Sequence, residues 1–84
     1  MKNGVKEDTV PDKEQFNFRR LKGRIIETYG SQRGFAEAMG MSAQMLSSRL
    51  NCHTSLSQGE IWHACILLDI APEEIGRFFF CRRK

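Results

Sequence analysis

Apolar residues recur along the chain with the period of an α-helix. In residues 17–29, the apolar positions are three and four residues apart, which places Phe18, Leu21, Ile25 and Tyr29 on one helical face. Gly30 follows the last of them, and a glycine at this position ends a helix because it accepts a positive φ. The pattern therefore predicts a first helix that begins near Asn17, its N-cap, and runs to Tyr29.

Residues 31–50 contain two shorter helical patterns that meet at Gly40. Ser31 and Ser42 are suitable N-caps, since a serine hydroxyl accepts a hydrogen bond from an early helix N–H. The apolar positions of the two helices are Phe35, Ala36, Met39, Leu46 and Leu50. The sequence thus predicts a helix, a tight turn and a second helix, an arrangement that can set the second helix into a DNA major groove.

Two further helices are predicted after residue 56. Ser57 and Glu60 have the Ser-x-x-Glu spacing of a capping box, and the apolar face of the helix that follows comprises Ile61, Ala64, Cys65 and Leu68. Pro72 suits the first position of a last helix, which contains Ile75, Phe78 and Phe79. No stretch alternates apolar and polar residues as a strand does. The fold class predicted is all-α, a compact five-helix domain.

Charge and composition divide the chain near residue 16. Residues 1–15 are polar and lack apolar periodicity, so we expect a flexible tail, followed by one domain over residues 16–84. Residues 1–16 hold three lysines and four acids, whereas residues 17–84 hold ten basic and six acidic residues. A basic domain suits a polyanionic partner. The absence of a long apolar run or a signal-peptide pattern predicts a cytoplasmic protein without a membrane span.

The remaining chemistry-bearing residues do not form a recognisable reactive site. The three cysteines have no C-x-x-C spacing, and Cys52 next to His53 lacks the further ligands of a zinc site, so we expect no metal and no cofactor. Cys65 is expected to be a small buried hydrophobe. No Gly-rich phosphate loop or catalytic pair is present, which argues against an enzyme and against a small-molecule ligand. The first helix carries basic residues off its apolar stripe, and either a solvated face or contact with phosphates fits them: Arg19, Arg20, Lys22 and Arg24.

The helix pair at residues 31–50 resembles the helix-turn-helix of Cro/C1-type (Xre-like) phage repressors. The residues that carry the resemblance are Gln32, Phe35, Ala36, Met39, Gly40, Met41 and Leu46. It implies a lambda-repressor-like domain and a sequence-specific regulator of transcription that binds double-stranded operator DNA, in the manner of a stand-alone Cro-like switch. The chain departs from the family at Arg49, where the family usually has an apolar residue.

The resemblance also implies which residues face DNA. The outward face of the second helix would contact bases through Ala43, Gln44, Ser47 and Ser48. The amide of Gln44 matches the N7 and N6 positions of adenine. Phosphate contacts are expected from Gln32, Arg33, Ser42, Arg49, Asn51, Thr54 and Ser55. For Arg49, an intramolecular salt bridge to Glu27 or Glu37 stays open as the alternative.

A dimer is expected, because one recognition helix reads only about 4–5 base pairs. Three consecutive phenylalanines cannot all face one small core, so we expect at least one on the surface, unless the chain end folds back over them. The predicted homodimer interface comprises Trp62, Phe78, Phe79 and Phe80. The same apolar residues fit the alternative function, a protein-interaction module such as an antirepressor or an antitoxin-like partner.

Overall fold

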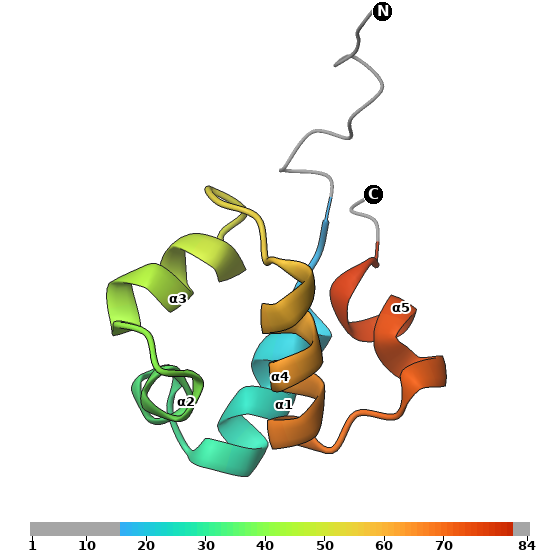
Figure 1. Cartoon of the computed structure of the whole chain (residues 1–84), viewed down its shortest axis with the longest axis horizontal. Coiled ribbons are helices and arrows are strands. Elements are labelled where there is room, and N and C mark those ends of the chain that lie inside the picture. Colours follow the sequence, from blue (N-terminus) through green and yellow to red (C-terminus); the bar gives the residue numbers. More distant parts are fainter. Residues whose placement is uncertain (1–15, 82–84) are drawn as a thin grey trace, which may run out of the picture.

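The computed structural model describes residues 16–81, which form five α-helices with no sheet (Figure 1). The elements are α1 (Arg19–Tyr29), α2 (Gln32–Met39), α3 (Ala43–Leu50), α4 (Gln58–Leu68), the 3-10 turn η3 (Pro72–Glu74) and α5 (Ile75–Phe79). The predicted all-α, five-helix fold is confirmed. The segment expected to be a flexible tail, residues 1–15, lies outside the described residues.

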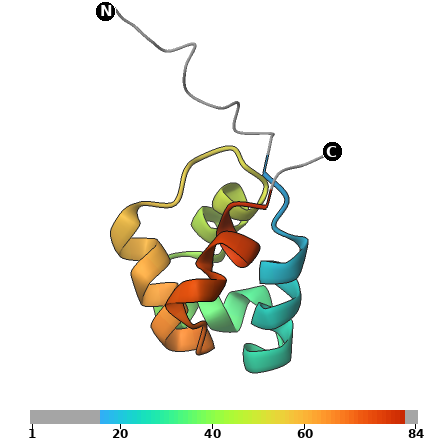
Figure 2. The same cartoon turned by 90° about the vertical axis from the view of Figure 1, so that its right-hand side faces the viewer.

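The core lies between the helices and receives buried side chains from all five of them. α5 packs on α1, on the side of the molecule away from α3, as the two views show (Figures 1 and 2). The buried apolar side chains are Leu21, Ile25, Phe35, Ala36, Met39, Leu46, Leu50, Ala64, Cys65, Leu68, Ile70, Phe78 and Phe79. α3 packs chiefly on α2 and therefore lies at the edge of the domain.

The first helix begins one residue later than the sequence predicts. Arg19 is its first residue and Phe18 its N-cap, whereas the expected N-cap was Asn17. Asn17 still acts on the helix end, because its Oδ1 accepts a hydrogen bond from the Arg19 N–H at 2.8 Å. The predicted stripe is confirmed, with Leu21 and Ile25 buried in the core and the residues at its two ends partly buried.

The two C-terminal elements start in different ways. The capping box of α4 is confirmed, since Ser57 Oγ accepts from the Glu60 N–H and the Glu60 carboxylate from the Ser57 N–H, both at 3.1 Å. Pro72, in contrast, begins the 3-10 turn η3, and α5 starts only at Ile75. The Glu74 N–H donates to the carbonyl three residues back, at 2.8 Å, which is the hydrogen bond of a 3-10 turn.

Arg24 holds α1 to the C-terminal half of the chain. Its Nη1 donates to the carbonyl of Leu68 at 2.6 Å, and its guanidinium carbon lies 5.0 Å from the centre of the Phe78 ring. A guanidinium at this place satisfies a carbonyl at the end of α4, which has no partner within its helix. Arg24 is thus neither on a free solvated face nor directed at a partner, the two roles expected from the sequence.

The core contains Cys65, which is buried as expected. This burial raises the pKa of the Cys65 thiol and so keeps the thiol protonated. Across residues 16–81, His, Cys, Asp and Glu side chains nowhere gather in threes that could hold a metal ion. In the same range, no helix is both long and apolar enough to cross a membrane.

Candidate nucleic-acid interface

The turn between α2 and α3 is built by local hydrogen bonds that the sequence encodes. The Ser31 hydroxyl accepts from the Gly34 N–H at 3.0 Å and starts α2. Gly40 ends it with a φ of 78°, and the Met41 N–H donates back to the Ala36 carbonyl at 3.0 Å. Only glycine adopts such a φ without steric cost. The helix-turn-helix therefore closes within three residues, as predicted.

The buried underside of α3 fixes which residues it presents outward. Leu46 and Leu50 are buried against α2 and the core, and Ser42 caps the helix by accepting from the Met45 N–H at 3.0 Å. The residues predicted to contact bases follow the opposite face: Ala43 and Gln44 are exposed, and Ser47 and Ser48 are half-buried. These four residues are called the α3 outer face below.

Met45 is 44% exposed. Its neighbour Leu46 occupies the core position, and consecutive residues of a helix are turned about 100° apart. Because α3 packs chiefly on α2 and lies at the edge of the domain, the side chain of Met45 projects toward solvent. Met45 consequently adds a flexible apolar side chain beside the α3 outer face.

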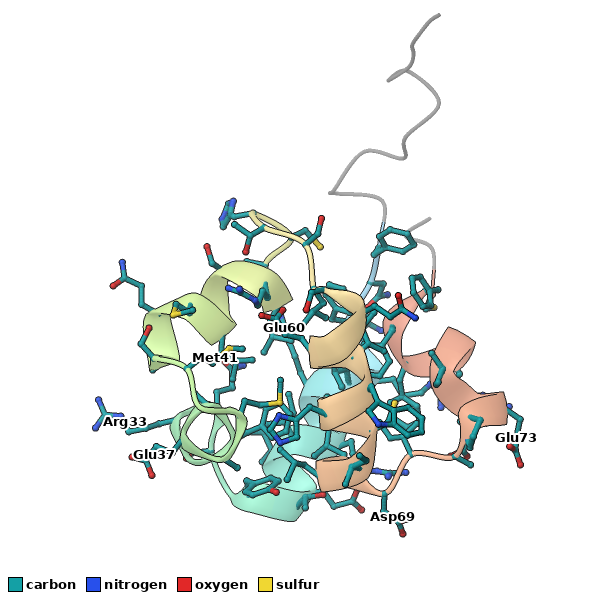
Figure 3. The ribbon with its side chains drawn as sticks, in the orientation of Figure 1. Arg33, Glu37, Met41, Glu60, Asp69 and Glu73 are labelled. Atoms are coloured by element: carbon teal, nitrogen blue, oxygen red, sulfur yellow. The ribbon has the colours of Figure 1, made fainter. Side chains whose placement is uncertain are left out.

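Arg49 is held inside the protein by Glu60. Its Nε and Nη2 donate to the two carboxylate oxygens at 2.9 and 3.0 Å, and its Nη1 donates to the Met45 carbonyl at 3.2 Å. The intramolecular ion pair is thus present, but the acid is Glu60 of α4 (Figure 3), not Glu27 or Glu37 as considered from the sequence. Because its Nε, Nη1 and Nη2 groups already donate within the protein, a contact from Arg49 to a phosphate would have to compete with this ion pair.

The Arg49–Glu60 pair also changes how both groups titrate. The hydrogen bond from Arg49 lowers the pKa of Glu60, outweighing the partial burial that opposes it, and the same hydrogen bond raises the pKa of Arg49. Oε1 of Glu60 accepts from the Ser57 N–H as well. One carboxylate therefore joins α3 to the first turn of α4.

The N-terminal end of α2 carries two of the residues expected to contact phosphate, Gln32 and Arg33. Arg33 is exposed and points away from the molecule, as does Glu37 one turn later (Figure 3), while Gln32 is half-buried. A Cβ at Gly34 would lie only 3.2 Å from the Tyr29 carbonyl oxygen. A glycine at this position therefore allows α2 to approach the end of α1 closely.

The loop after α3 presents the other predicted phosphate contacts. Asn51, Thr54 and Ser55 are all exposed, and the Asn51 amide donates to the Ser47 hydroxyl at 3.2 Å. Ser42, by contrast, uses its hydroxyl to accept the capping hydrogen bond. The residues expected to contact phosphate thus lie on both sides of α3, in α2 and in this loop (Figure 1).

A second surface, on α4 and α5, is apolar. Trp62 is 59% exposed, and together with Phe80, which is 50% exposed, it lines an open groove of about 500 Å³. Its other lining residues are Leu56, Gln58, Ile61 and Ile75. Phe78 and Phe79 are buried in the core, so the expectation that at least one of the three phenylalanines is exposed is met by Phe80. The predicted interface is consequently reduced to Trp62 and Phe80.

Sequence reasoning missed the acid that matters most for α3. The sequence predicted only a role in the capping box for Glu60. Its partner Arg49 lies 11 residues earlier in the chain, and the loop between them follows a path that no local pattern specifies. The unusual Arg49 was itself the available signal, because a charge at an expected apolar position must find a partner.

Comparison with known proteins places this geometry beside a phage protein. Residues 14–82 match the family described as "Protein of unknown function (DUF739)". Among solved structures, the solution structure of the modulator of repression (MOR) of the temperate bacteriophage TP901-1 from Lactococcus lactis is 35% identical, with a TM-score of 0.71, over 79% of this chain and 89% of that one. None of the curated proteins matches the chain.

Proposed function

The chain belongs to the DUF739 family, and we propose that it is a transcriptional regulator from a phage or prophage that binds double-stranded operator DNA through its helix-turn-helix. The α3 outer face carries this proposal. Ala43, Ser47 and Ser48 are small, which permits close approach to base edges, and the amide of Gln44 is exposed beside them. The similarity to a modulator of repression supports a role in the same kind of switch.

In this proposal α3 enters the major groove and Gln44 reads an adenine. Phosphate contacts from Gln32 and Arg33 on α2, and from the loop residues Asn51, Thr54 and Ser55, would fix its register without reading sequence. Arg49 acts indirectly, because its ion pair with Glu60 sets the position of α3 on α4. We propose that the DNA-binding domain spans residues 16–84.

The test is selection of binding sites from a pool of random duplexes. We expect one sequence to be enriched, and Gln44→Ala to lose about 1–3 kcal/mol of discrimination at a single base pair of it. Glu73→Ala is the control, because Glu73 is exposed on η3 and lies neither on the α3 outer face nor in the apolar groove. The proposal fails if the folded protein enriches no sequence, and the assignment of Gln44 fails if both variants keep the wild-type preference.

A second function, a protein-interaction module that modulates a repressor, is favoured by a separate observation. Trp62 and Ile66 on α4 are 59% and 61% exposed, and exposed apolar clusters mark surfaces that other proteins cover. A modulator of repression could act in this way without contacting DNA. The two functions differ at Gln44: Gln44→Ala should alter the sequence preference under the first function and have no effect under the second, in which Trp62→Ser should abolish binding of the protein partner.

The same apolar surface is where we propose a homodimer contact for the DNA-binding function. Two copies joined through Trp62 and Phe80 would present two α3 helices to one operator, and a palindrome with half-sites about one helical turn apart would be the expected product of the selection. A selected sequence without internal symmetry would contradict this dimer.

A further inference from the structure

An open groove of about 620 Å³ lies between α1 and the C-terminal end of α3. Arg19 and Lys22 line it from α1, and Asn51 lines it from the residue that follows α3. The loop is anchored here, because Cys52 Sγ donates to the Phe16 carbonyl at 3.5 Å. The groove is therefore part of the folded domain and borders the proposed DNA-binding surface.

The polar lining of the groove consists of two cations and two amides, beside Phe18, Leu50 and Cys52, and none of the residues that line it is an acid. Arg19 is exposed and Lys22 partly so, and neither takes part in the two ion pairs found within residues 16–81, which join Arg24 to Glu27 and Arg49 to Glu60. These two charges are thus available to an outside partner. The Asn51 amide is oriented by its hydrogen bond to Ser47 Oγ, at 3.2 Å. An anion held by two cations and an amide is the ligand that this chemistry fits.

We propose that this groove binds a backbone phosphate of DNA, with Arg19 and Lys22 supplying the charge and Asn51 a hydrogen bond. The inference rests on the proposed DNA-binding function and extends it, because the sequence alone left the basic residues of α1 undecided. It also replaces Arg49, which Glu60 occupies, by two cations that are available at the same end of α3.

The groove beside α1 lies where it would contact the DNA strand that α2 does not contact. α3 has eight residues and is therefore about 12 Å long, close to the width of the major groove, which is also about 12 Å. In Figure 1, α2 lies on one side of α3 and the loop that contains Asn51 on the other. Contacts at α2 and in the groove beside α1 would thus hold phosphates of opposite DNA strands. Together they would fix the angle at which α3 enters the major groove.

Salt dependence of DNA binding tests the proposal. The dissociation constant for the selected duplex, and for a duplex of mixed sequence, is measured between roughly 50 and 200 mM salt, the range where phosphate contacts show most clearly. We expect Lys22→Gln and Arg19→Gln each to reduce the slope of log K against log salt by about 0.9 per bound protomer, and to weaken binding about five- to tenfold per protomer near 0.1 M salt. Both duplexes should be affected alike, since a phosphate carries no sequence information.

The control is Arg77→Gln, which removes one charge from an exposed arginine on α5, away from α3 (Figure 1). The groove proposal is overturned if the two groove variants show the same slope as this control while the wild type binds DNA. If the wild type binds neither duplex, the proposed function fails and the groove proposal with it. Arg19 is exposed, so Arg19→Gln keeps the test valid if Lys22→Gln lowers the stability of the fold.

Discussion

α3 and α4 bury apolar faces in the same core, yet they expose opposite kinds of surface. α3 presents the small, mostly polar side chains of its outer face, whereas α4 presents Trp62 and Ile66, each more than half exposed. Exposed polar groups are already solvated, so a partner lowers their free energy only by specific hydrogen bonding. Exposed apolar groups are stabilised by any partner that shields them from water. The comparison thus supports the proposals that α3 serves recognition and that α4 serves association.

The two helices are also held in place differently. α3 lies at the edge of the domain and is attached through its leucines and through the Arg49–Glu60 pair, whereas α4 packs against both α1 and α2. A substitution that loosens α3 should therefore disturb DNA binding before it unfolds the domain.

The largest expected effect is on the free energy of unfolding, and it distinguishes a buried side chain of α3 from an exposed side chain of α4. Leu46→Ala should lower the free energy of unfolding by about 2–5 kcal/mol, because it empties a buried site that the small core cannot refill. Ile66→Ala, which removes an exposed side chain from α4, should change it by about 0.5 kcal/mol or less. Urea unfolding followed by circular dichroism measures both. Equal losses would show that the burial pattern of the two helices is not the one described.

What the sequence could predict depends on the distance over which each interaction acts. The N-caps Ser31, Ser42 and Ser57 each bind an N–H three residues ahead, so the sequence alone locates them. Arg24 reaches a carbonyl 44 residues away, and that contact exists only once α1 and α4 are packed. The fold class was therefore predictable from local patterns, and the ties between helices were not.

The candidate site divides in the same way. The exposure of Ala43 and Gln44 follows from the helical period once Leu46 is placed inside, and it was predicted. The fate of Arg49 depends on where Glu60 lies, and the division of the three phenylalanines depends on the late start of α5 at Ile75, after η3. Neither is encoded within one turn of helix.

A moderate effect on the free energy of unfolding is expected at the Arg49–Glu60 ion pair, which joins α3 to α4. Glu60→Gln should cost about 1–2 kcal/mol at neutral pH, because it removes a charge-assisted hydrogen bond while keeping an oxygen for the cap. The pKa of Glu60 is lowered in the folded state from its ordinary 4.5, so its contribution is complete above that pH and is lost as the pH falls through the folded pKa.

Unfolding measured from pH 7 down to pH 2 would test this tie. The wild type should lose its advantage over Glu60→Gln in the acid range, and the two should converge once the carboxyl group is protonated in both states. Glu73→Gln, which alters an exposed acid on η3 (Figure 3), controls for the general effect of charge. A constant difference between wild type and Glu60→Gln at every pH would mean that the ion pair does not position α3.

A small effect on stability, and the sharpest test of the comparison, is expected at Trp62. Trp62→Ser should change the free energy of unfolding by about 0.5 kcal/mol, since the side chain is mostly exposed, yet it should abolish self-association in sedimentation equilibrium. Ile61→Ser on the same helix would instead disturb packing, because Ile61 is partly buried against the core. A wild type that stays monomeric at high concentration would contradict the dimer. A Trp62→Ser variant that associates normally would move the interface elsewhere and leave α4 without the role that its surface suggests.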